Sequence, residues 1–459
     1  MPALPASEIF KAYDIRGIVD KTLTIEAVES IGQAIGSEAR ARGTPAVCVG
    51  RDGRLSGPAL AAALSRGLMK SGIDVVDIGL VTTPMLYFAA HHLGTGSAVM
   101  VTGSHNPPEY NGLKMVVAGS TLSGGEIQQL RQRIVSGTLS SGSGTLRHAQ
   151  ITEAYLGRIA GDIKLKRKMR IAVDCGNGVP GATAPELYRR LGCEVEELFC
   201  EVDGNFPNHH PDPSDPGNLQ DLTAALRRGE AEIGLAFDGD GDRLGVVTKA
   251  GRVIFADRQL MLFAADVLSR KPGAEILYDV KCTRNLAPWI RQHGGKATMW
   301  KTGHSLIKAK MKETGAALAG EMSGHVFFQE RWYGFDDGSY AGARLLEILS
   351  GLPDIEAAFA ALPDSLNTPE LQIRLQEGEN YALIERLQKT ARFSDAREVI
   401  DIDGLRVEYA DGFGLARASN TTPVIVLRFE ADNAAAIARI QADFRRVLHE
   451  ARPGLQLPF

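Results

Sequence analysis

Three stretches of the chain repeat the same order of hydrophobic and polar positions. In each, an apolar run typical of a buried strand leads into a polar turn, an amphipathic helix, a glycine and a second apolar run. We expect the helices to end near Gly72, Gly192 and Gly294, because glycine readily adopts the left-handed conformation that closes many helices. The stretches begin with AVCVGRDGR (46–54), RIAVDCGNG (170–178) and EILYDVKCT (275–283).

A further apolar run follows each repeat and passes directly into a polar loop. These runs are AVMVTGSHNP (98–107), IGLAFDGDGDR (233–243) and AALAGEMSGH (316–325). Strand–helix–strand units pair their strands in parallel under a cover of helices. Ligands gather beyond the carboxyl ends of such strands, because loops and helix N-termini converge there. The pattern therefore predicts three related mixed α/β domains, with helices around a sheet, that present three polar loops to a central cleft.

The pattern changes after about residue 364. Strand-like runs of alternating character are joined by short turns such as Asp403-Gly404 and Asp411-Gly412, with one helix expected at 381–391 and another at 434–451. This order predicts a C-terminal α+β domain with an antiparallel sheet, and the Gly/Ser-rich segment 136–145 is expected to be a flexible loop. The predicted domains are residues 1–149, 150–252, 253–364 and 365–459.

Composition and charge narrow the class of protein. Of the 459 residues, 44% are hydrophobic and 23% charged, which is ordinary for a soluble globular protein, and the net charge of −4 offers no general positive field to nucleic acid. The first residues do not resemble a signal peptide, and the apolar runs are too short to span a bilayer. We expect a cytoplasmic protein with no nucleic-acid or membrane partner. The five cysteines contain no CxxC pair and are expected to be buried, reduced thiols.

Three carboxylates alternate with glycines directly after the second of the later apolar runs. Asp238, Asp240 and Asp242 would repel one another unless a cation lay among them, and oxygen ligands favour Mg²⁺ or Ca²⁺. An EF-hand is excluded by Arg243 at the sixth position and Lys249 at the twelfth, whereas a HAD-type phosphatase would carry D-x-D-G-T. A solvated acidic turn is the alternative. Arg243 beside a cation indicates a site that handles phosphate.

The first polar loop holds a serine between a strand and two prolines. The hydroxyl of Ser104, flanked by His105 and Asn106, could carry a phosphoryl group, and Pro107 and Pro108 would restrict the loop and so fix its position. A turn that satisfies its own backbone through Ser and Asn side chains is the competing interpretation.

The third polar loop carries a glutamate, a serine and a histidine on one short turn. Glu321 and Ser323 suit a vicinal pair of sugar hydroxyls, and His325 can titrate near neutral pH and transfer protons. WKTGHS (300–305) lacks the glycine order of a Walker A loop, so His304 is expected to contact sugar or phosphate rather than a nucleotide.

A guanidinium, hydroxyls and an amide follow one another in the C-terminal segment RASNTTP (417–423). Arg417, Ser419, Asn420 and Thr421 could together bind a phosphate group without a Walker glycine loop.

In order and spacing, TGSHNPP, DGDGDR, GEMSGH and RASNTTP resemble the motifs of the α-D-phosphohexomutase superfamily, and KAYDIRG near the N-terminus matches as well. The resemblance extends over essentially the whole chain in four domains. GEMSGH is most similar to the bacterial phosphomannomutase/phosphoglucomutase group, because phosphoglucosamine mutases usually carry a sequence like GEQSGH there.

This resemblance implies an enzyme that interconverts hexose 1-phosphate and hexose 6-phosphate, with glucose and mannose as the sugars. It implies a phosphorylated Ser104, a bound hexose 1,6-bisphosphate intermediate and glucose 1,6-bisphosphate as activator. The phosphoserine would share one Mg²⁺ with Asp238, Asp240 and Asp242. A monomer is expected. Phosphoglucosamine mutase, a metal-dependent sugar phosphatase and a non-catalytic sugar-phosphate binding protein are the alternatives.

The resemblance also implies a role for each remaining site residue. The candidates for phosphate contact and proton transfer would be Arg16, His105 and Lys114. Arg243 would contact the sugar or the transferring phosphate, and His325 is the further catalytic candidate. The sugar would be bound by Lys281, His304, Glu321 and Ser323. The phosphate that is not being transferred would be held by Arg417, Ser419, Asn420 and Thr421.

Overall fold

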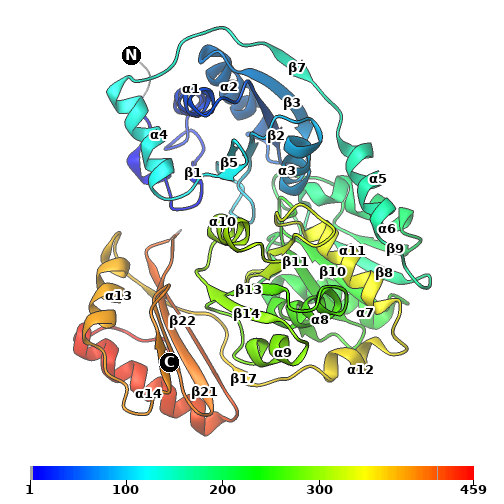
Figure 1. Cartoon of the computed structure of the whole chain (residues 1–459), viewed down its shortest axis with the longest axis vertical. Helices are drawn as coiled ribbons and strands as arrows, with labels where there is room; N and C mark the ends of the chain where they lie inside the picture. The colour runs from blue at the N-terminus through cyan, green and yellow to red at the C-terminus, as the bar shows by residue number, and fades with distance from the viewer. Residues whose placement is uncertain (1–3, 421) are drawn as a thin grey trace.

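The computed structural model of the chain describes residues 4–420 and 422–459. Four β-sheets follow one another in chain order, and in Figure 1 they lie along an arc from the N-terminal sheet at the top to the C-terminal sheet at the lower left. The second and third sheets lie on the right of this view, between the two ends of the arc. The order of the domains therefore follows the order of the predicted repeats.

The first sheet has strands in the order β1-β5-β4-β2-β3-β7, with β6 paired to β5. Alternate residues of a strand face opposite sides. Accordingly, Val47 and Val49 pack in a core with α1 and α2, whereas Cys48 packs in another core with α3. The elements are η1 (Ser7–Ile9), β1 (Ile15–Ile18), α1 (Ile25–Ala41), β2 (Ala46–Arg51), α2 (Gly57–Lys70), β3 (Asp74–Leu80), α3 (Thr83–His92), β4 (Ala98–Val101), β5 (Tyr110–Val117), β6 (Ser120–Thr121), α4 (Gly125–Ser136) and β7 (Leu146–His148).

The second sheet has the strand order β12-β11-β10-β8-β9 and the third has the order β14-β13-β15-β16. The elements of the second are α5 (Thr152–Asp162), β8 (Arg170–Asp174), η2 (Val179–Ala182), α6 (Ala184–Arg190), β9 (Glu194–Leu198), η3 (Pro216–Leu219), α7 (Gln220–Arg228), β10 (Ile233–Phe237), β11 (Leu244–Thr248) and β12 (Val253–Ile254). Those of the third are α8 (Ala256–Arg270), β13 (Glu275–Asp279), α9 (Leu286–Gln292), β14 (Lys296–Trp300), α10 (His304–Thr314), β15 (Leu318–Gly320), β16 (Val326–Phe328), α11 (Gly338–Leu349) and α12 (Ile355–Ala360).

The predicted repeat is confirmed by the pairing of the strands. In each of the three sheets, the first strand of the repeat has a parallel neighbour on either side, and an antiparallel strand follows the polar loop: β5-β4-β2-β3, β11-β10-β8-β9 and β16-β15-β13-β14. The sheets are mixed because a short loop can only return the chain antiparallel to the strand that it leaves. Gly72, Gly192 and Gly294 all have positive φ, as expected of residues that close helices.

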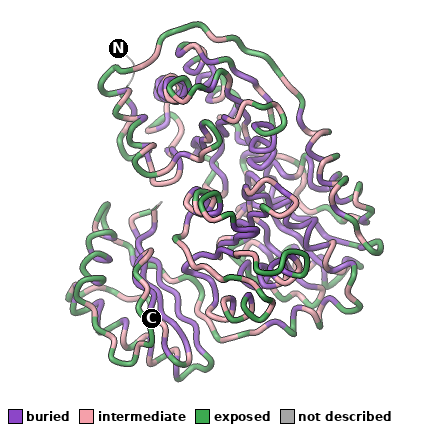
Figure 2. Tube along the Cα trace, viewed as in Figure 1, coloured by how far each residue is buried: buried purple, intermediate pink, exposed green. Residues whose placement is uncertain are grey.

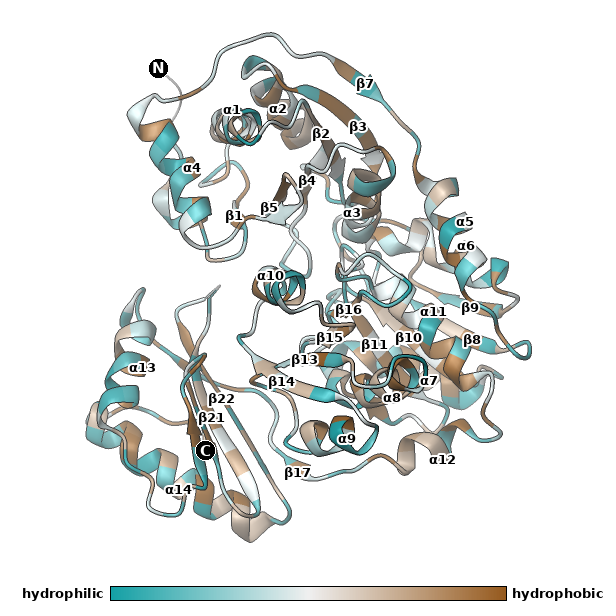
Figure 3. Cartoon of the chain, viewed as in Figure 1, coloured by the Kyte–Doolittle hydropathy of each residue, from teal (hydrophilic) through white to brown (hydrophobic). Residues whose placement is uncertain are grey.

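The C-terminal sheet is antiparallel throughout, as predicted, with the order β17-β22-β21-β20-β19 and β18 paired to β22. In Figure 3 its strands β21 and β22 are largely brown, whereas the outer helix α13 is mostly teal. The elements are β17 (Leu366–Asn367), β18 (Leu371–Arg374), α13 (Glu379–Thr390), β19 (Glu398–Ile400), β20 (Leu405–Glu408), β21 (Gly412–Ala418), β22 (Val424–Ala431) and α14 (Ala434–Ala451).

One apolar core joins the first three sheets, and the C-terminal sheet has a core of its own. The joint core includes Met85 of α3, Tyr155 of α5 and Trp332, whose ring stacks on Tyr340 at a centroid distance of 4.2 Å. Figure 2 shows the corresponding run of buried chain between the domains. The three loops that leave these sheets therefore rest on a common packed base.

Three further features bear on the sequence predictions. All five cysteines are free; four are buried as expected, while Cys200 is only partly buried. Segment 137–145 has no regular structure, but its backbone bonds to Met69 and Lys70, and it leads into β7 at the edge of the first sheet. Within the described residues, no helix has the length and apolar character needed to cross a membrane. The domain boundaries stay predictions.

Candidate active site

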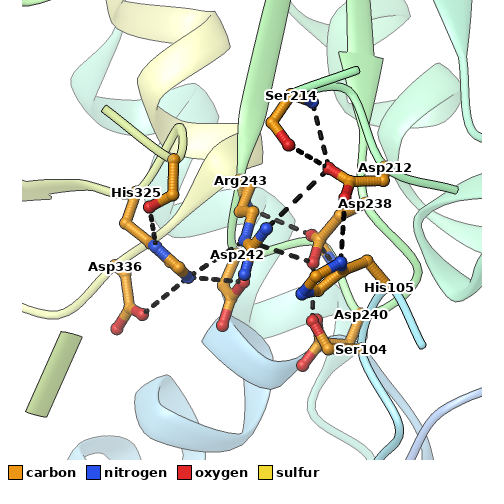
Figure 4. Close-up of polar contacts among 12 residues, drawn as sticks. Ser104, His105, Asp212, Ser214, Asp238, Asp240, Asp242, Arg243, His325 and Asp336 are labelled. Atoms are coloured by element: carbon orange, nitrogen blue, oxygen red, sulfur yellow. Dashed lines mark hydrogen bonds and ion pairs between the residues drawn. The ribbon is translucent and has the colours of Figure 1, made fainter. Parts of the chain in front are cut away.

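The polar loops of the first three sheets meet, as the repeat predicts (Figure 4). Ser104, between β4 and β5, donates a hydrogen bond from Oγ to Oδ2 of Asp238 at 2.8 Å. Asp242, from the same loop as Asp238, lies 3.2 Å from Nε2 of His325 in the loop between β15 and β16. Ser104, Asp238, Asp242 and His325 are all buried, so loops from three sheets enclose one polar centre.

The backbone at Ser104 is in the left-handed region, with φ of +49°. This conformation costs a residue with a side chain roughly 1–2 kcal/mol, and it occurs mainly where the surrounding structure enforces it. The amide of Ser104 donates to Oγ1 of Thr102 at 2.8 Å. A Cβ on Gly239 would lie 2.3 Å from the carbonyl oxygen of Ser104, so the acidic loop can approach this closely only with glycine at that position.

The three aspartates form a fully buried group whose carboxylate oxygens lie within 4.8 Å of one another. Among the described residues, Oδ1 of Asp240 has no hydrogen-bond partner, and Oδ1 of Asp242 faces only Nε2 of His325, at 3.2 Å. Burial, followed by the charges of Asp240 and Asp242, raises the pKa of Asp238 well above its usual value. A hard cation bound by oxygen atoms fits this set of donors, because it would use the open lone pairs and offset the mutual repulsion.

Lys114 of β5 extends into the acidic group. Its Nζ lies 2.7 Å from Oδ2 of Asp240 and 2.5 Å from Oδ2 of Asp242. Burial on its own would lower the pKa of Lys114, but the two carboxylates outweigh burial and raise it. Lys114 therefore holds two of the acidic side chains in place.

Thr83, the first residue of α3, also holds Asp240. Its hydroxyl donates to Oδ2 of Asp240 at 2.5 Å, and its amide donates to the carbonyl oxygen of Asp240 at 2.9 Å. Thr83 is not among the site residues predicted from the sequence. The available signal was a Thr-Thr-Pro helix start directly after an apolar strand.

His105 is oriented by Asp212, a residue of the second domain that the sequence analysis also missed (Figure 4). Nδ1 of His105 lies 2.9 Å from Oδ2 of Asp212, whose Oδ1 accepts a hydrogen bond from Ser214 at 2.6 Å. Desolvation, followed by the charge of Arg243, lowers the pKa of His105 to about 4. A neutral imidazole in this position would donate from Nδ1 to Asp212 and keep a lone pair on Nε2.

His325 lies between two carboxylates. Its Nδ1 is 2.9 Å from Oγ of Ser323 and 3.3 Å from Oε2 of Glu321, and its Nε2 faces Asp242. Burial alone would lower the pKa of His325, but these carboxylates outweigh it and raise the pKa to about 9. The ring of His304 stacks on His325 at a centroid distance of 5.8 Å, so His304, Glu321 and Ser323 all lie around the ring of His325.

Arg16 contacts the serine loop from the N-terminal segment. Its Nη1 donates to the carbonyl oxygen of Gly103 at 2.9 Å, and its Nη2 pairs with Asp14. Arg243 lies 3.8 Å from Asp212 and 3.9 Å from Asp238, measured between the nearest charged atoms. Arg16 therefore contacts the loop that carries Ser104, and Arg243 lies beside Asp238, the hydrogen-bond partner of Ser104.

The C-terminal loop joins the site through the third domain. Nε of buried Arg417 donates to Oδ2 of Asp403 at 3.0 Å, and the same carboxylate oxygen accepts from the amide of Thr302. Asn420 donates to the hydroxyl of Tyr13, which in turn donates to the carbonyl oxygen of Thr302 at 2.6 Å. Tyr13 thus links segments of the first, third and fourth domains.

Two other predicted residues make contacts in the described part of the chain, and a third lies outside it. Lys281 forms an ion pair with Glu370 at 3.1 Å, and the carbonyl oxygen of Ser419 accepts from Asn380. The predicted phosphate contact Thr421 lies outside the described residues.

Four family models match the chain in succession. They are described as phosphoglucomutase/phosphomannomutase alpha/beta/alpha domain I (residues 7–140), domain II (153–251), domain III (256–364) and C-terminal domain (370–447).

Similar proteins share almost the full length. The chain is 61% identical over 454 residues to a phosphoglucomutase of Neisseria gonorrhoeae, with 98% of each protein covered. It is 57% identical over 459 residues to a phosphomannomutase/phosphoglucomutase of Pseudomonas aeruginosa, covering 100% of this chain and 99% of that protein. The crystal structure of a phosphoglucomutase/phosphomannomutase family protein from Burkholderia thailandensis superposes with a TM-score of 0.95 at 60% identity, covering 99% of this chain and 100% of that one.

Proposed function

The chain belongs to the phosphoglucomutase/phosphomannomutase family and is an isomerase of hexose phosphates, and we propose that Ser104 is the residue that carries the phosphoryl group. The observation that supports this role is the hydrogen bond of Ser104 to Asp238, within a buried acidic group and on a constrained backbone. A serine hydroxyl held in this way can be phosphorylated and can return the group to a second hydroxyl.

We infer that the acidic group binds Mg²⁺. Asp238, Asp240 and Asp242 would hold the ion together with the phosphorylated Ser104, since the three carboxylates meet and Oδ1 of Asp240 has no hydrogen-bond partner among the described residues. When bound, Mg²⁺ would neutralise negative charge on the phosphoryl oxygens. Arg16 beside the serine loop would add positive charge at the same place.

The proposed reaction consists of two transfers. The sugar hydroxyl attacks phosphorus, the bond from phosphorus to Oγ of Ser104 breaks, and the proton of the attacking hydroxyl passes to a base. His105, held by Asp212, is the candidate base, and His325, held by Asp242 with a raised pKa, is the candidate acid that supplies a proton to the departing Oγ. The hexose 1,6-bisphosphate then turns end for end, and its other phosphate returns to Ser104. The burial of these groups would keep water from the phosphoserine.

The remaining predicted residues would hold the sugar and its second phosphate. Glu321 and Ser323 would accept and donate hydrogen bonds to ring hydroxyls, near Lys281 and His304 of the same domain. Arg417, Ser419, Asn420 and Thr421 would bind the phosphate that is not being transferred. Because the substrate reverses its direction, one such phosphate site serves both halves of the reaction.

The mass of the intact protein tests this proposal. After phosphatase treatment, incubation with glucose 1,6-bisphosphate should add about 80 Da on Ser104, the mass of one phosphoryl group. Glucose 1-phosphate should then take up this phosphoryl group to form glucose 1,6-bisphosphate. Return of the other phosphate to Ser104 should release glucose 6-phosphate and leave the enzyme phosphorylated. Release of inorganic phosphate without isomerisation would indicate a phosphatase, and no covalent change would indicate a binding protein.

Glucose and mannose phosphates are the proposed substrates, and glucose 1,6-bisphosphate is the proposed activator. Turnover of the 1-phosphates of glucose, mannose and glucosamine should show the first two preferred, whereas preference for glucosamine 1-phosphate would support the alternative enzyme. A cytoplasmic location and a monomeric state stay predictions.

Replacing Thr83 with valine is expected to lower Mg²⁺ affinity about tenfold, because residues that orient metal ligands typically contribute 10- to 100-fold to affinity. Valine keeps the shape of threonine but loses the hydroxyl that holds Asp240. Calorimetric titration with Mg²⁺ measures the effect. Thr95→Val is a suitable control, since its hydroxyl bonds to Ser97 outside the acidic group. An unchanged Mg²⁺ affinity in Thr83→Val would contradict this role.

Replacing Arg417 with alanine is expected to lower kcat/KM about 10- to 100-fold, because hydrogen bonds to charged groups contribute about 1.5–3 kcal/mol. The guanidinium would contact phosphate and no sugar hydroxyl, so kcat/KM should fall by a similar factor for glucose and mannose substrates. Glu321→Ala is the comparison, since it removes a hydroxyl contact and should spare the binding of free phosphate analogues. A loss in Arg417→Ala that depended strongly on the sugar would show that this loop recognises the ring.

A further inference from the structure

We propose that Arg54 is the positioning residue for Ser104. Its guanidinium binds the backbone carbonyl groups of the loop that carries Ser104 and thereby sets the direction of Oγ. Arg54 contacts the backbone of the loop and not the hydroxyl, so it acts through Ser104 and does not touch substrate. This inference rests on the proposed phosphoryl transfer by Ser104.

The contacts of Arg54 are with main-chain carbonyl groups of a single loop. The side chain is fully buried and donates hydrogen bonds to four of these oxygens within seven residues of chain. Nη2 donates to the carbonyl oxygens of Ser104 (2.8 Å) and Asn106 (2.5 Å), and Nη1 donates to those of Pro107 (2.6 Å) and Tyr110 (2.9 Å). The loop thus folds around one planar cation.

Asp52 contacts both Arg54 and the two residues that precede Ser104. Its Oδ2 accepts hydrogen bonds from Oγ1 of Thr102 at 2.7 Å and from the amide of Gly103 at 3.2 Å, and it lies 3.3 Å from Nε of Arg54. Thr102 in turn accepts from the amide of Ser104. Asp52 therefore accepts from donors just before the serine, and Arg54 donates to carbonyl groups at and after it. Each charge offsets part of the cost of burying the other.

A guanidinium is specifically suited to this position. Its donors spread in one plane toward several acceptors, whereas the ammonium of lysine is compact and has three donors. The loop also requires space for it, since a Cβ on Gly103 would lie 2.3 Å from Cζ of Arg54. Phe206 of the second domain covers the guanidinium, with its ring centroid 5.1 Å from Cζ.

The left-handed backbone of Ser104 connects these contacts to the chemistry. The carbonyl oxygen of Ser104 is fixed by Arg54 and its amide by Thr102, so both peptide groups around the serine are restrained. Without the guanidinium we expect this unfavourable φ to relax and Oγ to move away from Asp238. The contacts that would bind the sugar and the second phosphate lie on other loops and should be unaffected.

The test is single-turnover phosphoryl transfer from phosphorylated enzyme to saturating glucose 1-phosphate. The first variant is Arg54→Lys, which keeps the charge but loses the planar donors. The second is Gly103→Ala, whose added Cβ would collide with the guanidinium and push it away from the loop. Arg344→Lys is the matched control, because Arg344 is equally buried and binds Asp266 and Glu330 away from the serine loop. Circular dichroism and thermal unfolding identify the folded variants, and the dissociation constant of glucose 1-phosphate is measured for each.

We expect transfer to slow by about 100-fold in folded Arg54→Lys or Gly103→Ala, the scale of loss that a misplacement of roughly 1 Å causes. The dissociation constant of glucose 1-phosphate should stay within about threefold in both, since their substrate contacts are intact. Arg344→Lys should lose thermal stability but transfer at the wild-type rate.

The inference is overturned if either folded variant transfers at the wild-type rate, or if its whole loss is in the dissociation constant. It is also overturned if Arg344→Lys slows transfer as much as Arg54→Lys, because destabilisation alone would then explain the effect. A wild-type enzyme that never phosphorylates Ser104 would instead refute the proposed function.

Discussion

Replacing Ser104 with alanine is expected to lower turnover by more than about 10⁴-fold, since loss of a covalent catalytic group removes a step of the reaction. The fold and the binding of glucose 1-phosphate should be largely kept, because the proposed sugar and phosphate contacts lie on other loops. The measurements are kcat/KM for glucose 1-phosphate, its dissociation constant, and the intact mass after incubation with glucose 1,6-bisphosphate. No phosphoryl mass should appear.

Two control variants separate chemistry from structure. Ser104→Gly lacks the hydroxyl but relieves the left-handed backbone, so it should be as inactive as the alanine variant and at least as stable. Ser97→Ala removes an equally buried hydroxyl, one that bonds to Thr44 and to the amide of Ala118, and should keep most of the activity. Near-normal turnover in Ser104→Ala, after wild-type contamination is excluded, would refute the phosphoserine mechanism.

Loss of the metal is expected to lower turnover by roughly 10³-fold, the upper range for removing one preorganised electrostatic contact from an active site. Asp240→Asn should weaken Mg²⁺ binding and turnover together, because it removes one of three carboxylates while Thr83 and Lys114 still hold the side chain. Excess Mg²⁺ should restore part of the activity. Calorimetric titration with Mg²⁺ and steady-state rates after treatment with EDTA measure both effects.

A matched carboxylate lies outside the three loops. Asp266 of α8 pairs with Arg270 and Arg344, so Asp266→Asn should leave Mg²⁺ affinity unchanged even if it lowers stability. Wild-type protein that kept full turnover after exhaustive removal of divalent ions would show that the acidic group has no catalytic metal.

Periodicity and glycine placement were sufficient to predict most of the fold. The final helix was expected at 434–451 and occurs as Ala434–Ala451, and the three repeats have the expected parallel strand pairs. Such features depend on local conformation and on the alternation of buried positions, which a sequence displays directly. The antiparallel strand in each mixed sheet is different. It forms because the chain turns back after the polar loop and pairs with the strand before that loop, and no local pattern of residues displays this pairing.

The site was predictable only where its chemistry is concentrated in short motifs. Ser104 and the three aspartates stand out because hydroxyl and carboxylate groups follow apolar strands directly. Arg54 and Asp212 did not stand out, since their roles consist of contacts with other loops and not of any local pattern. The catalytic, metal-binding, sugar-binding and phosphate-binding roles of individual residues stay predictions, and the variants described above test them.

The sequence by itself determined the class of fold, the family and the loops that carry the chemistry, because each is written in residues that lie close together along the chain. Only the tertiary structure decided what supports those loops. It brings Arg54 into hydrogen-bond contact with the backbone of Ser104, and Asp212 with His105. It likewise brings Lys114 and Thr83 into contact with Asp240. These partners are far apart in sequence, and their contacts exist only because the packed core of three sheets brings the loop-bearing strand ends together.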